Sequence, residues 1–156
     1  QAFWASGDAN WARLSGMPSF SALIDETLRI FPPTPLIARL SNGADQIGTH
    51  AILQDQNVLI SFVGIQNDTQ LRADPWVVDL EKGIEKGGDK GGEAAFGFGP
   101  RICGGKQFAL VELMTFVSVF LAQARFESNS SAEPVFHWKA QMLRQGGQAV
   151  RVTALA

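Results

Sequence analysis

The ten residues 96–105 constrain this chain more than any other stretch, because they hold its only cysteine among glycines and a proline. They read FGFGPRICGG, and an apolar helical pattern begins directly after them at Lys106. A cysteine at a helix N-terminus faces unpaired N–H groups and the positive end of the helix dipole, which lower the pKa of its thiol. The resulting thiolate can attack a substrate, bind a metal ion or bind haem iron.

Spacing argues against several common motifs. A phosphate-binding loop of the form G-x-x-x-x-G-K-[ST] would need glycine at Pro100, and a dinucleotide fingerprint starting at Gly97 would need glycine at Ile102. Covalent haem attachment through C-x-x-C-H needs a second cysteine. A zinc site needs several Cys or His ligands, and the two histidines, His50 and His137, lie far from the cysteine in sequence.

The stretch fills the pattern F-x-x-G-x-R-x-C-x-G, with a small residue four positions further on. It resembles the haem-binding loop of the cytochrome P450 family. The resemblance implies that Cys103 is the thiolate ligand of the iron in haem b (iron protoporphyrin IX), where a thiolate favours O–O cleavage. It also implies that Arg101 pairs with a haem propionate, since a guanidinium matches a carboxylate. The other loop residues expected around the haem are Phe96, Gly97, Gly99, Gly105 and Ala109.

A second pattern lies upstream, in a helical stretch over residues 19–31 that two prolines terminate. Glu26 and Arg29 lie three residues apart, so their side chains share one helix face and can pair. E-x-x-R before Pro-Pro is the second hallmark of the same family, and the segment resembles its K helix. The resemblance implies a structural Glu26–Arg29 ion pair and a propionate contact by Arg39, which follows the proline turn.

Residues 79–95 depart from the family pattern. Their glycines and charges predict a surface loop. Family members carry Phe-x-Pro-x-Arg here, and its arginine joins the E-x-x-R pair, but this chain has no arginine between Arg72 and Arg101. We therefore expect either that a lysine such as Lys82 substitutes for it or that the ion pair has no third member.

The predicted fold class is α+β, as part of a P450-like fold with a K helix, a small β-sheet region, the cysteine loop and a proximal L helix. We expect a single partial domain over residues 1–156, the C-terminal part of a P450-like haem domain. Apolar alternation and turn residues predict a hairpin between residues 50–53 and 58–63. Residues 135–138 and 149–154 predict a second strand pair.

The segment 108–124 is almost wholly apolar, but Glu112 and Gln123 interrupt it and it is short for a membrane span of about 20 residues. We predict a buried core helix here and no transmembrane segment in the chain. The side chains expected to be buried are Phe108, Val111, Met114, Val117, Phe120, Leu121 and Ala124.

Composition narrows the classes of partner. The 156 residues are 46 % hydrophobic and 18 % charged, as in a globular domain, and the net charge of -2 gives no electrostatic reason to bind nucleic acid or an anionic membrane. A single cysteine cannot form an intrachain disulfide, which fits an intracellular and most simply cytoplasmic location. The first residues lack the features of a signal peptide, and we expect a chain processed or taken from a longer protein.

The resemblance implies a haem-thiolate oxidoreductase of the monooxygenase type, which inserts one oxygen atom of O2 into a small apolar organic substrate and takes electrons from a redox partner. It covers only the C-terminal part of the family's domain, so no catalytic residue on the distal side of the haem is assigned. A second chain that completes the fold is therefore an expected partner. Two alternatives stay open, a haem-thiolate isomerase or dehydratase of oxygenated lipids and a non-catalytic haem-binding or interaction module.

Overall fold

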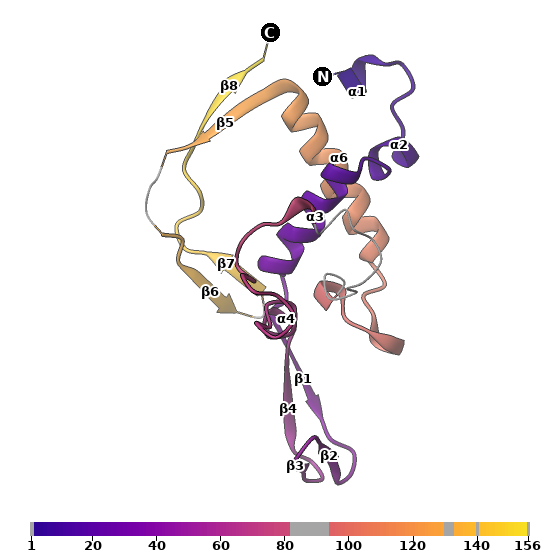
Figure 1. Cartoon of the computed structure of the whole chain (residues 1–156), viewed down its shortest axis with the longest axis vertical. Coiled ribbons are helices and arrows are strands. Elements are labelled where there is room, and N and C mark those ends of the chain that lie inside the picture. Colours follow the sequence, from indigo (N-terminus) through magenta and orange to yellow (C-terminus); the bar gives the residue numbers. More distant parts are fainter. Residues whose placement is uncertain (1, 82–93, 130–132, 140, 156) are drawn as a thin grey trace.

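The computed structural model describes residues 2–81, 94–129, 133–139 and 141–155. Runs of helices are followed by runs of strands in small two-stranded sheets along the chain (Figure 1), which agrees with the predicted α+β class. The elements are α1 (Ala2–Ala5), α2 (Trp11–Ser15), α3 (Pro18–Ile30), β1 (Leu36–Leu40), β2 (Asp45–Ile47), β3 (His50–Ile52), β4 (Asn57–Ser61), α4 (Phe62–Gln66), the 3-10 turn η2 (Gly99–Arg101), α6 (Lys106–Gln123), β5 (Ala124–Ser128), β6 (Phe136–Lys139), β7 (Gln141–Arg144) and β8 (Val150–Ala154).

Helix α3 confirms the helix predicted from the E-x-x-R stretch. Pro18 lies in its first turn, where the missing N–H costs nothing, and the helix ends at Ile30 before two prolines that cannot continue it. Its buried positions include both apolar side chains and the charged pair Glu26 and Arg29. One helix therefore contributes to the core and to a buried polar network.

The core described here is small and joins three helices. Leu14 of α2, Ile24 and Leu28 of α3 and Met114 of α6 form one buried cluster, and Phe96 of the cysteine loop packs against it. Burial of such side chains contributes about 1.5–3 kcal/mol each. The cluster thereby holds the cysteine loop against α3 and α6, which cross one another in Figure 1.

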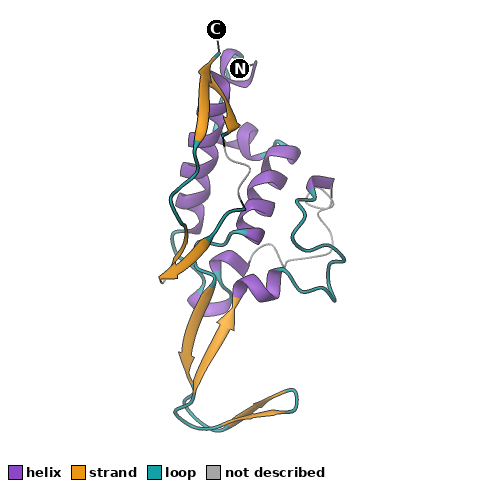
Figure 2. Cartoon of the chain, turned by 90° about the vertical axis from the view of Figure 1, so that its left-hand side faces the viewer, coloured by secondary structure: helices purple, strands orange, loops and turns teal. Residues whose placement is uncertain are grey.

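The strand pairing around residues 36–61 differs from the predicted hairpin. β4 pairs with β1, with Ile37 opposite Ile60, while β3 pairs with β2. The predicted turn exists, since Gln56 N–H donates to Leu53 C=O, but hydrogen bonds between Ser41 and both Gln56 and Asp55 direct the chain after the turn toward β1. The result is a long ribbon with the β2–β3 pair at its far end, which projects from the helices (Figure 2).

The C-terminal pairing also differs from the prediction. β8 pairs with β5, which continues directly from α6, and β6 pairs with β7 across a very short connection. Strands 135–138 and 149–154 were each expected correctly, but not their partners. Periodicity identifies a strand, whereas its partner depends on contacts between distant parts of the chain.

The expected burial of α6 is wrong. Of the seven side chains predicted to be buried, only Met114 is; Phe108 is 73 % exposed, and Val111, Phe120 and Leu121 are exposed as well. A helix that is apolar around its whole circumference needs neighbours on every side, and the described elements cover one stripe of it. By length and composition, α6 also satisfies the criteria for a helix that could cross a membrane, the one such helix among the described residues.

Candidate functional site

A partly open hollow of about 830 Å³ lies between the cysteine loop, the first half of α6 and the β1–β4 ribbon. Its volume falls in the range of small-molecule and cofactor sites. The wall is mainly apolar, and Cys103, Arg39 and Arg101 supply some of its few polar groups. The hollow thus combines an apolar surface with one thiol, two guanidinium groups and the carboxylate of Glu112.

The cysteine loop is closed by its own backbone. Cys103 N–H donates to Phe96 C=O at 2.8 Å, and Ile102 N–H donates to Gly99 C=O at 3.1 Å across η2. Gly97 and Gly99 have φ angles of 74° and 66°, a region in which residues with side chains are strained. This explains two of the glycines and leaves the Cys103 side chain exposed at the wall of the hollow.

Six of the eight cofactor-binding residues expected from the sequence line this one hollow: Cys103, Arg101, Arg39, Phe96, Gly97 and Ala109. Gly99 and Gly105 do not line it and act on the loop instead, since Gly105 caps the N-terminus of α6. A Cβ atom built on Gly105 would lie 3.8 Å from Cys103 Sγ. Arg39 and Cys103 are far apart in the sequence, and the tertiary fold places both at the wall of the same hollow.

Other lining residues come from patterns that sequence reasoning left unused. On the ribbon, Ile37 and Arg39 of β1, together with Ile60 of β4, follow the two-residue period of one sheet face, and Phe62 continues it. On α6, residues 109, 113 and 116 follow the helical period. With the hollow assigned to one face of the ribbon and one face of α6, the strand and helix periodicities would have predicted these lining residues.

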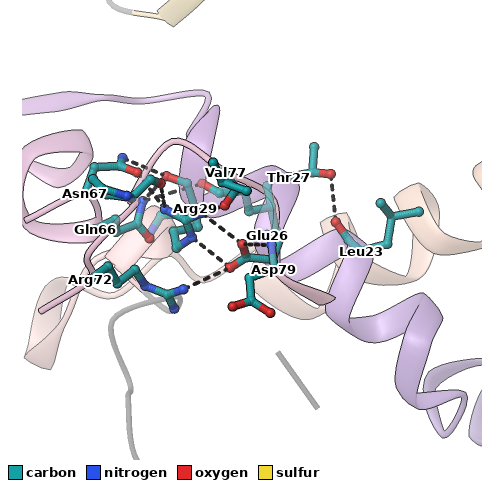
Figure 3. Close-up of polar contacts among 12 residues, drawn as sticks. Leu23, Glu26, Thr27, Arg29, Gln66, Asn67, Arg72, Val77 and Asp79 are labelled. Atoms are coloured by element: carbon teal, nitrogen blue, oxygen red, sulfur yellow. Dashed lines mark hydrogen bonds and ion pairs between the residues drawn. The ribbon is translucent and has the colours of Figure 1, made fainter. Parts of the chain in front are cut away.

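The predicted Glu26–Arg29 ion pair is present, buried and part of a larger network (Figure 3). Arg29 donates to both carboxylate oxygens of Glu26, with Nε–Oε1 at 2.7 Å and Nη2–Oε2 at 2.9 Å. Its remaining donors reach Asn67 Oδ1 at 2.6 Å, Val77 C=O at 3.1 Å and Pro75 C=O. Neither residue of the pair lines the hollow, and Arg29 instead connects α3 to residues 67, 75 and 77.

The network has a third charged member, contrary to one of the two alternatives expected. Arg72 Nη1 lies 3.6 Å from Glu26 Oε1, and the Asp79 backbone N–H donates to Glu26 Oε2 at 3.0 Å. The alternative with Lys82 falls outside the described residues. A local sequence pattern could not identify Arg72, because 46 residues separate it from Glu26 and it precedes the segment where the family has its arginine.

The protonation of Glu26 makes stability depend on pH. Burial raises the pKa of this carboxyl, but the hydrogen bonds from Arg29 and Asp79 and the charges of Arg29 and Arg72 outweigh burial and hold the pKa below its ordinary value. The unfolded chain therefore binds a proton at a higher pH than the folded chain does. We expect the free energy of unfolding to fall as the pH drops below about 4.3, the ordinary glutamate value, and Glu26→Gln to flatten this decline. Urea titrations at several acidic pH values measure the free energy of unfolding of both proteins. An equally steep decline in Glu26→Gln would contradict the prediction.

Solved structures share this fold. The chain superposes with a TM-score of 0.82 on the retinoic acid bound cyanobacterial CYP120A1, at 21 % identity over 92 % of this chain and 34 % of that one. It superposes equally well, at 0.82, on the cytochrome P450DA heme domain, at 19 % identity over 96 % of this chain and 34 % of that one. The fold is therefore part of a cytochrome P450 fold, made of mixed helices and small sheets.

Sequence comparison leads to the same family. The cytochrome P450 family model matches residues 3–150. Similar proteins include cytochrome P450 4X1 of Rattus norvegicus, 30 % identical over 81 % of this chain, and cytochrome P450 78A7 of Arabidopsis thaliana, 32 % identical over 84 %. The matches cover 26 % of each relative. The chain belongs to the cytochrome P450 family, and it spans about a quarter to a third of the length of the relatives it matches.

Proposed function

We propose that this chain is the haem-ligating part of a P450-type monooxygenase, with Cys103 as the thiolate ligand. The observation that carries the proposal is the exposed Cys103 side chain at the wall of a large apolar hollow. In this proposal α3 is the K helix, α6 is the proximal L helix, and residues 1–156 form the C-terminal part of one haem domain.

The residues around the hollow fit such a group. A porphyrin needs an apolar surface for its faces and cations for its propionates, and the hollow offers an apolar wall with Arg39 and Arg101 in it. Arg101 is exposed and has no ion-pair partner among the described residues, so its guanidinium is available. Phe96 and Gly97 would complete the contact surface beside the thiol.

When bound, haem with a thiolate ligand supplies the activation of dioxygen and the insertion of one oxygen atom into a substrate. This chain's residues hold and orient that group. The glycine conformations present the thiol, and the hydrogen bond from Cys103 N–H to Phe96 C=O fixes the loop. Helix α6 begins at Lys106, three residues after Cys103, so the positive end of its dipole would favour negative charge on the sulfur. Arg39 and Arg101 would bind the propionate carboxylates of the haem.

We propose that activity of the whole domain depends on further polypeptide. The matched relatives are three to four times longer, and the apolar faces of α6 lie exposed. We propose that the rest of a P450 domain, in the same polypeptide or in a second chain, covers these faces and supplies the distal side of the site. An intracellular setting, an electron-donating partner and a small apolar substrate belong to this proposal.

A second candidate is a non-catalytic haem-binding module. The observation that favours it is the openness of the hollow, which the described elements leave uncovered on one side. The two candidates differ in turnover. When the remaining part of a P450 domain is supplied, haem-reconstituted protein that oxidises no apolar substrate with peroxide supports the module, whereas oxidation supports the monooxygenase.

We expect the reduced, haem-reconstituted protein to give, with carbon monoxide, the strongly red-shifted Soret band of thiolate-ligated haem. Cys103→Ala should lose this band, because no other thiol exists in the chain. His50→Ala is the matched control, since histidine is also a residue type that can bind iron, and His50 is exposed and does not line the hollow. A band that persists in Cys103→Ala, or that wild type lacks, would overturn the proposal.

A further inference from the structure

Gln66, the last residue of α4, is a buried polar side chain that connects two separate parts of the molecule. It is only 3 % exposed. Its Nε2 donates to Arg29 C=O at 3.1 Å and to Leu28 C=O at 3.5 Å, while its Oε1 accepts from Ala95 N–H at 3.1 Å. Both ends of one amide are thus occupied, by the end of α3 on one side and by the entry to the cysteine loop on the other.

The α3 end needs this donor because of the sequence that follows it. In a continuing helix, Leu28 and Arg29 C=O would accept from residues four positions later, which are Pro32 and Pro33 and have no N–H. The last helical bond runs from Phe31 N–H to Thr27 C=O. Gln66 therefore supplies a donor to carbonyl groups that the two prolines leave without a helical one, and Asn67 Nδ2 also donates to Arg29 C=O, at 3.4 Å.

The other end reaches the cysteine through two backbone steps. Ala95 lies in a 3-10 turn next to Phe96, and its neighbour Ala94 is fully buried. Phe96 C=O in turn accepts from Cys103 N–H at 2.8 Å. A displacement of Ala95 would move the carbonyl group that holds the cysteine in place.

We propose that Gln66 is a positioning residue that holds Cys103 in the geometry required for ligation. An amide suits this role because it carries a donor and an acceptor at one side-chain end, whereas a carboxylate lacks the donor, and a thioether of comparable length has no donor and is only a weak acceptor. The part of the inference that concerns ligation rests on the proposed haem function. The part that concerns the loop does not.

The first test needs no haem. In Gln66→Met we expect the Ala95 and Cys103 amides to exchange hydrogen about tenfold faster and the Cys103 thiol to be alkylated faster, because the loop loses a buried hydrogen bond. Amides of the β5–β8 pair serve as the internal reference, and Gln54→Met, an exposed turn residue, is the matched control. Equal acceleration in the β5–β8 pair, or loop exchange within about twofold of wild type, overturns the proposal.

A second variant covers the case in which Gln66→Met does not fold. Gln66→Asn keeps the amide but is one methylene shorter, so it cannot reach both α3 and Ala95, and the same selective loop exchange is expected. In reconstituted protein, either variant should show a smaller share of the thiolate carbonyl band than wild type and Gln54→Met, and an unchanged share overturns the ligation part. If wild type takes up no haem, the proposed function fails, while the exchange measurement still decides the role of Gln66.

Discussion

Arg29→Met is expected to lower the free energy of unfolding by about 3–5 kcal/mol, because it leaves the Glu26 carboxylate buried without its main partner. Arg29 is 1 % exposed and Glu26 3 % exposed, so solvent cannot replace the lost bonds. Asn67 and two backbone carbonyls lose their donor at the same time. Urea denaturation followed by circular dichroism measures the change, which is a large share of the total stability of a small domain.

Two further variants separate the buried charge from other effects. Arg125→Met removes an arginine of the same kind from an exposed position on β5 and should change stability by less than about 0.5 kcal/mol. Adding Glu26→Gln to Arg29→Met should recover part of the loss, since the unpaired charge is then gone. A cost below about 1 kcal/mol for Arg29→Met, the size expected of an exposed pair, would contradict the network as described.

Arg101→Ala is expected to accelerate haem loss about 10- to 100-fold in reconstituted protein. A hydrogen bond to a charged group contributes about 1.5–3 kcal/mol, and each 1.4 kcal/mol corresponds to a factor of ten. The side chain lines the hollow and forms no ion pair within the described part of the chain, so a propionate would be its main partner. Transfer of haem to an excess of apomyoglobin measures the rate.

Charge and geometry at this position can be tested separately. Arg101→Lys keeps the charge but loses the planar pair of donors, so its rate should lie between those of wild type and Arg101→Ala. Arg125→Ala, on the exposed strand β5, should leave the rate unchanged. A wild-type rate in Arg101→Ala would remove Arg101 from the site without affecting the case for Cys103.

The sequence was most informative where local patterns decide the structure. Prolines at both ends define α3, glycines at positive φ define the cysteine loop, and spacing together with the family resemblance predicted the Glu26–Arg29 pair. These features depend on residues within one or two turns of each other. The family assignment rests on the same short segments, and the comparisons confirm it.

What the sequence did not predict depends on contacts between distant segments. Arg72 reaches Glu26 across 46 residues, and Gln66 reaches Ala95 across 29. The strand partners of β3 and β8 were wrong for the same reason, since periodicity carries no information on which strand lies next to which. The burial of α6 was misjudged because an apolar sequence does not say how much of a helix its neighbours cover, and the described elements cover one stripe of this one.

Every strand described here belongs to a sheet of two, so each has a side whose peptide groups no described strand satisfies. A two-stranded sheet is only marginally stable in water, and its unpaired edges readily form hydrogen bonds with strands of other molecules. When produced alone at high concentration, the chain should therefore self-associate through its ribbons. Low protein concentration during refolding, or charged substitutions on the unpaired edge of β1, should favour the monomer.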